Sequence, residues 1–101
     1  QIKVVKLIMA NGCPKNFNVA TTIKGDTRAY DLRYLLNIKG CKPMKVEEYP
    51  KAETLFLIAP TNRPPEIETV WEVSSMGKFQ IKREENLNEV IKFYELEKIK
   101  N

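Results

Sequence analysis

The chain contains 101 residues, of which 43% are hydrophobic and 30% are charged, and its formal net charge is +4. This length suits one compact domain that removes roughly 65% of its unfolded surface from water. No apolar run approaches the roughly 20 residues that cross a bilayer, so we expect a soluble piece.

Apolar residues at helical spacing predict a first helix over about residues 2–11, and Gly12 supplies a stop signal after it. A short apolar run over residues 17–21 then predicts the first strand, which breaks at the pair Lys24 and Gly25. The chain therefore opens with a helix followed by a buried strand.

The next segment predicts a second, amphipathic helix. Asp26 or Thr27 is expected to cap its first turn, and Gly40 ends it. Its leucines lie on one face, while Arg33 and Lys39 are expected to point to water. A strand, a helix and a further strand in this order favour a right-handed crossover unit.

Two strand candidates follow, separated by a short polar stretch. Residues 42–46 form a weak candidate, and residues 47–51 predict a turn or a single helical turn. Residues 54–59 read TLFLIA, a continuous apolar run that is typical of a strand covered on both faces. We expect this last strand to be central in the sheet, and the order of the strands stays open.

The remaining third begins with a proline-rich loop over residues 60–65. A short helix ending at Gly77 is predicted next, with an extended WEVSS segment as the competing interpretation. Residues 78–83 and 89–98 predict a hairpin, although a helix also fits the second of these segments. The fold class that follows is α/β, with α+β as the alternative: a small mixed sheet of about five strands, two to three helices and a C-terminal β-hairpin.

The net charge is unevenly distributed along the chain. Residues 1–45 hold 9 Lys or Arg against 2 Asp, a balance of +7, whereas residues 46–101 hold 8 against 11 Glu, a balance of −3. A basic surface of this kind suits anionic lipid head groups or phosphosugars. We do not expect a nucleic-acid partner, because Phe17, Tyr30 and Tyr34 are assigned to core faces and form no stacking platform.

The two cysteines leave the redox compartment open, because a pair suits either one bridge or two buried thiols. Cys13 precedes the first strand and Cys41 follows the second helix. In a right-handed crossover unit both would lie at the amino-terminal edge of the sheet, which makes a disulfide geometrically suitable and favours an extracytoplasmic location. The chain has no histidine to complete a zinc site or a catalytic dyad, and we expect neither a metal nor a cofactor.

A ligand site would most naturally lie where the first predicted strand meets the second helix. Ligands collect at the carboxyl ends of parallel strands, where helix N-termini attract anions. If the strand over residues 54–59 runs parallel to the first, the loop after it approaches the same edge. The predicted ligand-binding residues are Lys24, Gly25, Asp26, Thr27, Arg28, Asn62 and Arg63. We assign no catalytic residue; a weaker hypothesis makes Asp26 a catalytic acid or base.

Two stretches resemble a known family. They are KNFNVATTIKGDTRAYDLRYLL at residues 15–36 and TLFLIAPTNRPPEIETVWEVSSMGKFQI at residues 54–81, which together cover roughly half of the chain. They resemble the soluble C-terminal domain that follows the membrane helices in prokaryotic glycosyltransferases of the dolichyl-phosphate-mannose protein mannosyltransferase type.

The resemblance implies an extracytoplasmic accessory domain of an enzyme that moves a sugar from a polyprenyl-phosphate donor. Its partners would be the membrane-embedded part of the parent chain, anionic lipid head groups or a protein acceptor, and the domain alone would not be catalytic. The first residue, Gln1 rather than Met, fits an expectation that the domain is excised from a longer membrane protein. The alternative is a stand-alone cytosolic module that binds a phosphorylated small molecule at the predicted site.

Overall fold

The computed structural model of the chain describes residues 2–10, 12–22, 30–62, 65 and 75–99, which form two α-helices, one 3₁₀ helix and four strands. In chain order these elements are α1 (Ile2–Ile8), β1 (Phe17–Thr21), α2 (Tyr30–Ile38), the 3₁₀ helix η1 (Val46–Lys51), β2 (Thr54–Pro60), β3 (Phe79–Asn86) and β4 (Ile91–Lys98). The first helix, the first strand and the hairpin all lie where the sequence predicts them. The predicted helix before Gly77 lies outside the described residues.

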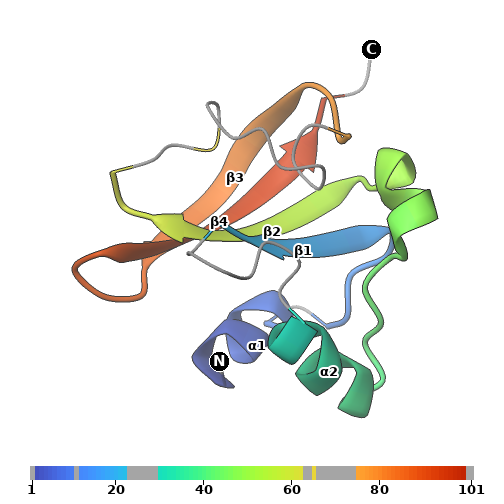
Figure 1. The fold of residues 1–101 in the computed structure, drawn as a ribbon, viewed down its shortest axis with the longest axis horizontal. Helices are drawn as coiled ribbons and strands as arrows, with labels where there is room; N and C mark the ends of the chain where they lie inside the picture. Colours follow the sequence, from blue (N-terminus) through green and yellow to red (C-terminus); the bar gives the residue numbers. More distant parts are fainter. Residues whose placement is uncertain (1, 11, 23–29, 63–64, 66–74, 100–101) are drawn as a thin grey trace.

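The four strands form one mixed sheet in the order β1-β2-β4-β3 (Figure 1). β1 pairs with β2 in parallel, whereas β4 pairs with both β2 and β3 in antiparallel fashion. The α/β prediction is therefore confirmed, and β2 is central as expected because it lies between β1 and β4. The connection from β1 to β2 passes through α2, as parallel pairing requires.

The predicted strand over residues 42–46 is wrong, and its absence accounts for a sheet of four strands rather than five among the described residues. The Met44 N–H donates to the Phe17 carbonyl at the edge of β1, but the Met44 carbonyl accepts from the Arg33 guanidinium instead of from a strand. Pro43 has no N–H to offer. The segment thus makes one strand-like hydrogen bond and cannot continue a ladder. The polar stretch after it forms η1, as expected.

Both helices cover the same face of the sheet (Figure 1). Val4, Val5 and Ile8 of α1 and Leu32 and Leu36 of α2 are buried against this face. Together with residues from the strands they form the helix-side core, which also contains Phe17, Val19, Cys41, Phe56, Ile58 and Phe93. Three aromatic rings connect the strands there, with centroids 5.8 Å apart between Phe17 and Phe56 and 5.9 Å apart between Phe56 and Phe93.

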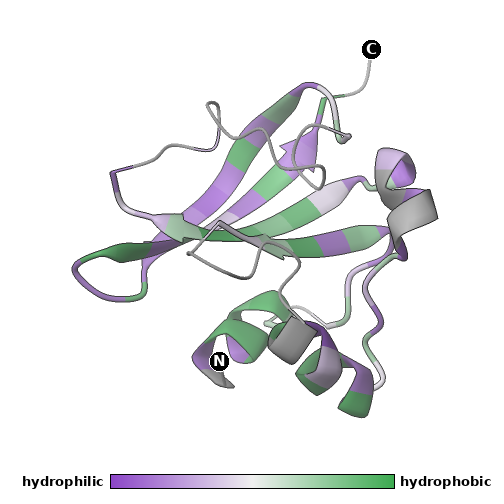
Figure 2. Ribbon diagram, viewed as in Figure 1, coloured by the Kyte–Doolittle hydropathy of each residue, from purple (hydrophilic) through white to green (hydrophobic). Residues whose placement is uncertain are grey.

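The other face of the sheet has a second, smaller core. Its buried residues are Ala20, Leu55, Leu57, Ala59, Met76, Tyr94 and Leu96, with Phe79 packed against them. β2 contributes to both cores, since its five interior residues are all buried. This confirms the prediction that the TLFLIA run is covered on both faces. Figure 2 shows the hydrophobic colour continuing along β2, hydrophobic and hydrophilic colours alternating along α1, and hydrophilic colour at the turn between β3 and β4.

The C-terminal hairpin is confirmed, and the competing helix is wrong. The carboxamide oxygen of Asn88 accepts hydrogen bonds from the Val90 and Ile91 N–H groups at 2.8 and 2.9 Å, which closes the turn. The Leu87 N–H donates to the Ile91 carbonyl at 3.0 Å. These local bonds favour a turn over the helix that the apolar spacing also fits, because an Asn side chain competes for backbone donors.

Two expectations for α2 are wrong. Tyr34, assigned to a core face, is 66% exposed, because Leu32 and Leu36 define the buried side of the helix and Tyr34 lies opposite them. Arg33, expected to point to water, is half-buried, and its guanidinium reaches three acceptors. The reason lies in β1, where Asn18 is fully buried and its side-chain oxygen accepts hydrogen bonds from both the Val19 N–H and the Arg33 guanidinium.

Candidate functional site

The predicted site lies at the edge of the sheet where β1 and β2 end. The two strands run parallel with Thr21 opposite Ile58, and the Thr22 N–H continues the pairing by donating to the Ile58 carbonyl at 2.9 Å. The loops that leave β1 and β2 therefore start at the same edge, which is the condition the predicted site required. Most of its residues lie outside the described part of the chain; these are Lys24, Gly25, Asp26, Thr27, Arg28 and Arg63.

Asn62 is the member of the predicted set that the structure describes. It is exposed and lines a shallow pocket of about 510 Å³, together with Pro60, Thr61, Glu89 and Val90. The Thr61 N–H donates to the Val90 carbonyl at 2.9 Å, so the end of β2 is fixed against the hairpin turn. The described lining offers an amide, a hydroxyl and a carboxylate. A phosphate would need its positive charge from elsewhere, because Glu89 repels it.

The opposite end of the sheet carries a second cleft, of about 540 Å³. Its lining residues are Lys15, Glu53, Thr54, Gln80, Glu97, Lys98 and Ile99. Thr54 of β2 and Gln80 of β3 both pair with Glu97 of β4, so three polar residues lie in one row across adjacent strands. Hydroxyl, amide and carboxylate groups in a row are suited to hydrogen bonding with a hydroxyl-rich or peptide ligand. We call these lining residues the polar cleft.

The groups of the polar cleft are held by hydrogen bonds. The Gln80 side chain donates to Glu97 at 3.3 Å, and the Lys82 ammonium lies 3.5 Å from the other oxygen of Glu97. The Asn16 side chain donates to Glu53 at 2.9 Å. Sequence reasoning missed this cleft because its residues come from separate parts of the chain, and only the strand pairing brings them together. Once the pairing register of the hairpin is known, the contact between Gln80 and Glu97 can be predicted.

The guanidinium of Arg33 already donates hydrogen bonds to acceptors within the protein. Its guanidinium donates to the Asn18 side-chain oxygen at 2.6 Å, to the Val19 carbonyl at 2.7 Å and to the Met44 carbonyl at 3.2 Å. These bonds tie α2 to β1 and to the segment before η1. Arg33 therefore has a structural role.

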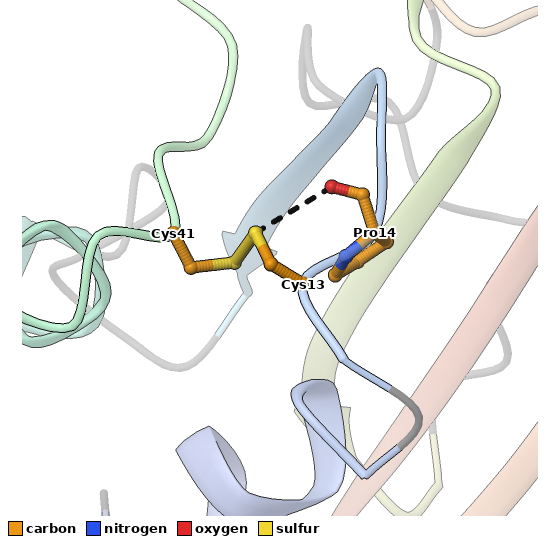
Figure 3. Close-up of a disulfide and its surroundings, with 3 residues drawn as sticks. All are labelled: Cys13, Pro14 and Cys41. Carbon is orange, nitrogen blue, oxygen red and sulfur yellow. Dashed lines mark hydrogen bonds between the residues drawn. A yellow bond between two sulfur atoms is a disulfide. The ribbon is translucent and has the colours of Figure 1, made fainter.

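A disulfide joins Cys13 and Cys41, the two cysteines that the sequence places at the same edge of the crossover unit (Figure 3). Their Cα atoms are 5.5 Å apart, and 28 positions separate them in the sequence. Cys13 lies between α1 and β1, and Cys41 follows α2 and is completely buried in the helix-side core. The bond closes a loop that contains both β1 and α2.

Among the described residues, no cluster of three or more His, Cys, Asp or Glu side chains is arranged to bind a metal ion. Within the same part of the chain, no helix has both the length and the apolar character needed to span a bilayer. No protein-family model matches the chain, and comparisons with curated proteins and with solved structures found no match.

Proposed function

We propose that this chain is a non-catalytic, extracytoplasmic accessory domain of a membrane glycosyltransferase that uses a polyprenyl-phosphate sugar. The resemblance of residues 15–36 and 54–81 to the C-terminal domains of that family motivates the proposal. In that family the catalytic acidic residue lies in a loop between membrane helices. The domain would then assist an active site that another part of the protein supplies.

The disulfide is the observation that carries the proposal. Disulfides persist in oxidising compartments and are rare in the cytosol, where thiols are kept reduced. Cys41 is fully buried, which is typical of a structural bridge rather than of a redox-active cysteine. Both observations favour the extracytoplasmic side of a membrane.

The polar cleft supports an acceptor-orienting role. Its row of Thr54, Glu97 and Gln80 combines donors and acceptors on rigid strands, and rigid elements hold such groups more accurately than loops do. A peptide or sugar acceptor presents hydroxyl and amide groups that match this lining. Substitution of Gln80 by Leu would remove one pair of hydrogen-bonding groups without disturbing the core, since Gln80 is exposed.

A free-thiol titration of the unfolded, unreduced protein tests the location. We expect protein purified from an oxidising compartment to contain no free thiol, and the same protein after reduction to contain two. A Cys13→Ser variant calibrates the assay, because it leaves Cys41 as a single thiol. Two free thiols in the unreduced wild-type protein would contradict the extracytoplasmic assignment.

A second candidate function is favoured by the parallel pairing of β1 and β2. This pairing brings the ends of both strands to one edge, the usual place for an anionic ligand in an α/β sheet. A stand-alone cytosolic module would bind a phosphorylated small molecule there through Gly25, Thr27, Arg28 and Arg63. Titration with inorganic phosphate, followed by the amide NMR signals of Thr22 and Asn62, tests this. An Arg28→Glu variant that binds phosphate as well as the wild type would remove the site.

A further inference from the structure

The side of α2 that faces away from the sheet carries two large apolar residues. Leu32 and Leu36 are buried against the sheet, while Tyr34 and Ile38 are 66% and 64% exposed. Tyr34 and Ile38 are four positions apart and therefore neighbours on the helix surface. A nine-residue helix thus has apolar residues on two opposite sides, although only one side contacts the described core.

α1 lies beside α2 in the same layer and presents lysines in the same direction. Val4, Val5 and Ile8 point into the helix-side core, which leaves Lys3 and Lys6 on the opposite side of α1, where both are exposed. The two helices contact each other and cover one face of the sheet (Figure 1), so their outward sides point the same way. We call this surface the outer helix face; it consists of Lys3, Lys6, Tyr34 and Ile38.

The first 45 residues, which include both helices, are rich in exposed lysines. Six lysines of the first 45 residues are described and exposed: Lys3, Lys6, Lys15, Lys39, Lys42 and Lys45. The only acidic residues in these 45 positions are Asp26 and Asp31. β3, on the sheet edge farthest from β1, is balanced in charge, with two basic and two acidic residues: Lys82, Arg83, Glu84 and Glu85.

We propose that the outer helix face docks on an anionic lipid bilayer. Tyr34 and Ile38 enter the head-group region, where tyrosine is enriched in membrane proteins because its ring is amphipathic. The lysines around them contact lipid phosphates, with their aliphatic stems covering apolar surface. Charge complementarity selects this partner over a second copy of the chain, because two basic faces repel each other.

The inference rests on the proposed function in one respect, since that function brings the domain next to a membrane. It adds which surface of the domain faces the lipid. A face that holds the domain at a fixed orientation restricts where an acceptor can bind, which is a positioning role without chemistry.

Co-sedimentation of the 101-residue chain with lipid vesicles tests the proposal. One set of vesicles contains phosphatidylcholine alone, and the other contains an equal mixture of phosphatidylcholine and phosphatidylglycerol. We expect binding to the mixed vesicles at low salt, weaker binding as salt rises, and little binding to phosphatidylcholine. Equal binding to both sets, or no binding to either, overturns the proposal.

Two matched pairs of variants locate the contact. Ile38→Gln should lower the partition coefficient roughly tenfold by removing an inserted apolar side chain, whereas Val90→Gln should leave it unchanged, because Val90 is 65% exposed at the hairpin turn. Lys3→Glu/Lys6→Glu should weaken binding by roughly 30-fold or more. Lys51→Glu/Lys78→Glu makes the same charge change at exposed sites outside the face. If each control weakens binding as much as its partner, the face is not the contact.

Sedimentation velocity separates lipid docking from self-association. We expect a monomer for the wild type and for Ile38→Gln. A wild-type dimer that Ile38→Gln dissociates would overturn lipid docking in favour of a second copy. The two proposals can fail separately. A failure to bind vesicles would not change the result of the thiol titration. Free thiols would refute the extracytoplasmic location without changing the result with vesicles.

Discussion

The parallel half of the sheet and the hairpin half are stabilised in different ways. All five residues of β1 are buried. The two helices cover β1 and β2, and the disulfide joins the segment before β1 to the segment after α2. In β3, by contrast, six of eight residues are exposed and most are polar or charged. The comparison shows that apolar burial and a covalent link stabilise the parallel half, whereas polar pairs between strands stabilise the outer part of the hairpin half.

Arg83 is the main polar link in the hairpin half. Its guanidinium donates to Glu95 of β4 at 3.1 Å and to the Leu7 carbonyl of α1 at 2.7 Å, and it lies 5.3 Å from the centre of the Phe93 ring. The pairing register of β3 shifts between Ile81 and Arg83, and this irregularity is a β-bulge that redirects side chains. The charged, bulged β3 also discourages pairing with another chain at the sheet edge.

The largest expected effect comes from Phe56, which joins the two halves. Its ring contacts Phe17 of β1 and Phe93 of β4 in the helix-side core. Phe56→Ala should lower the free energy of unfolding by about 3–5 kcal/mol, because it leaves a cavity in a packed core. Urea denaturation measures the change. Ile81→Ala is the control in the partly exposed β3, and an equal loss there would contradict the contrast between the halves.

Removal of the disulfide should destabilise mainly the parallel half. The chain-entropy model assigns about 3–4 kcal/mol to a loop of this length. Cys13→Ser/Cys41→Ser is expected to show this loss in urea denaturation. Hydrogen exchange should speed up first in β1 and α2, with the β3–β4 amides retaining more protection. Uniform acceleration in all four strands would mean that the two halves unfold as a single unit.

Much of the fold could be predicted from the sequence because its signals are local. The buried runs that became β1 and β2, the helical spacing of α1, and the turn between the last two strands all indicate structure within a few residues. The predicted strand at residues 42–46 is wrong partly for a local reason, the missing N–H of Pro43, and partly for a non-local one. Its fate depends on Arg33, which takes the Met44 carbonyl, and no local pattern reveals that contact.

The candidate site was less accessible to sequence reasoning. The sequence left the parallel pairing that joins two loops at one edge as a condition, and the structure has this pairing. The polar cleft could not be predicted in the same way. Gln80 meets Glu97 only through the register of the hairpin, and Thr54 meets Glu97 only through the antiparallel pairing of β2 with β4. Tyr34 was misassigned because an aromatic residue in an amphipathic helix is usually buried, although its spacing from Leu32 and Leu36 places it on the opposite side of the helix.

A comparison of two arginines sharpens the contrast on a smaller scale. Arg33→Met leaves the buried oxygen of Asn18 and two backbone carbonyls without this donor, so we expect a loss of about 2 kcal/mol. Arg83→Met breaks its contacts with Glu95 and α1 where water can substitute, so a loss of about 1 kcal/mol is expected. Urea denaturation of both variants tests the order. A larger loss at Arg83 would mean that polar contacts matter more in the hairpin half.

The smallest expected effect is a pH dependence confined to the hairpin. The hydrogen bond to the Glu84 carboxylate, 3.0 Å away, raises the pKa of Lys92 above its ordinary value of 10.5, and the charges of Glu84 and Tyr94 act in the same direction against the effect of burial. Because the folded pKa is the higher one, the ion pair stabilises the fold fully below the ordinary value, and this contribution disappears as the pH rises through the raised pKa. Urea midpoints measured from about pH 9 to about pH 12 should therefore fall less steeply for Lys92→Met than for the wild type. Lys78→Met, at an exposed site next to β3, should retain the wild-type slope. An unchanged slope in Lys92→Met would show that the pair between β3 and β4 contributes nothing to the stability of the hairpin half.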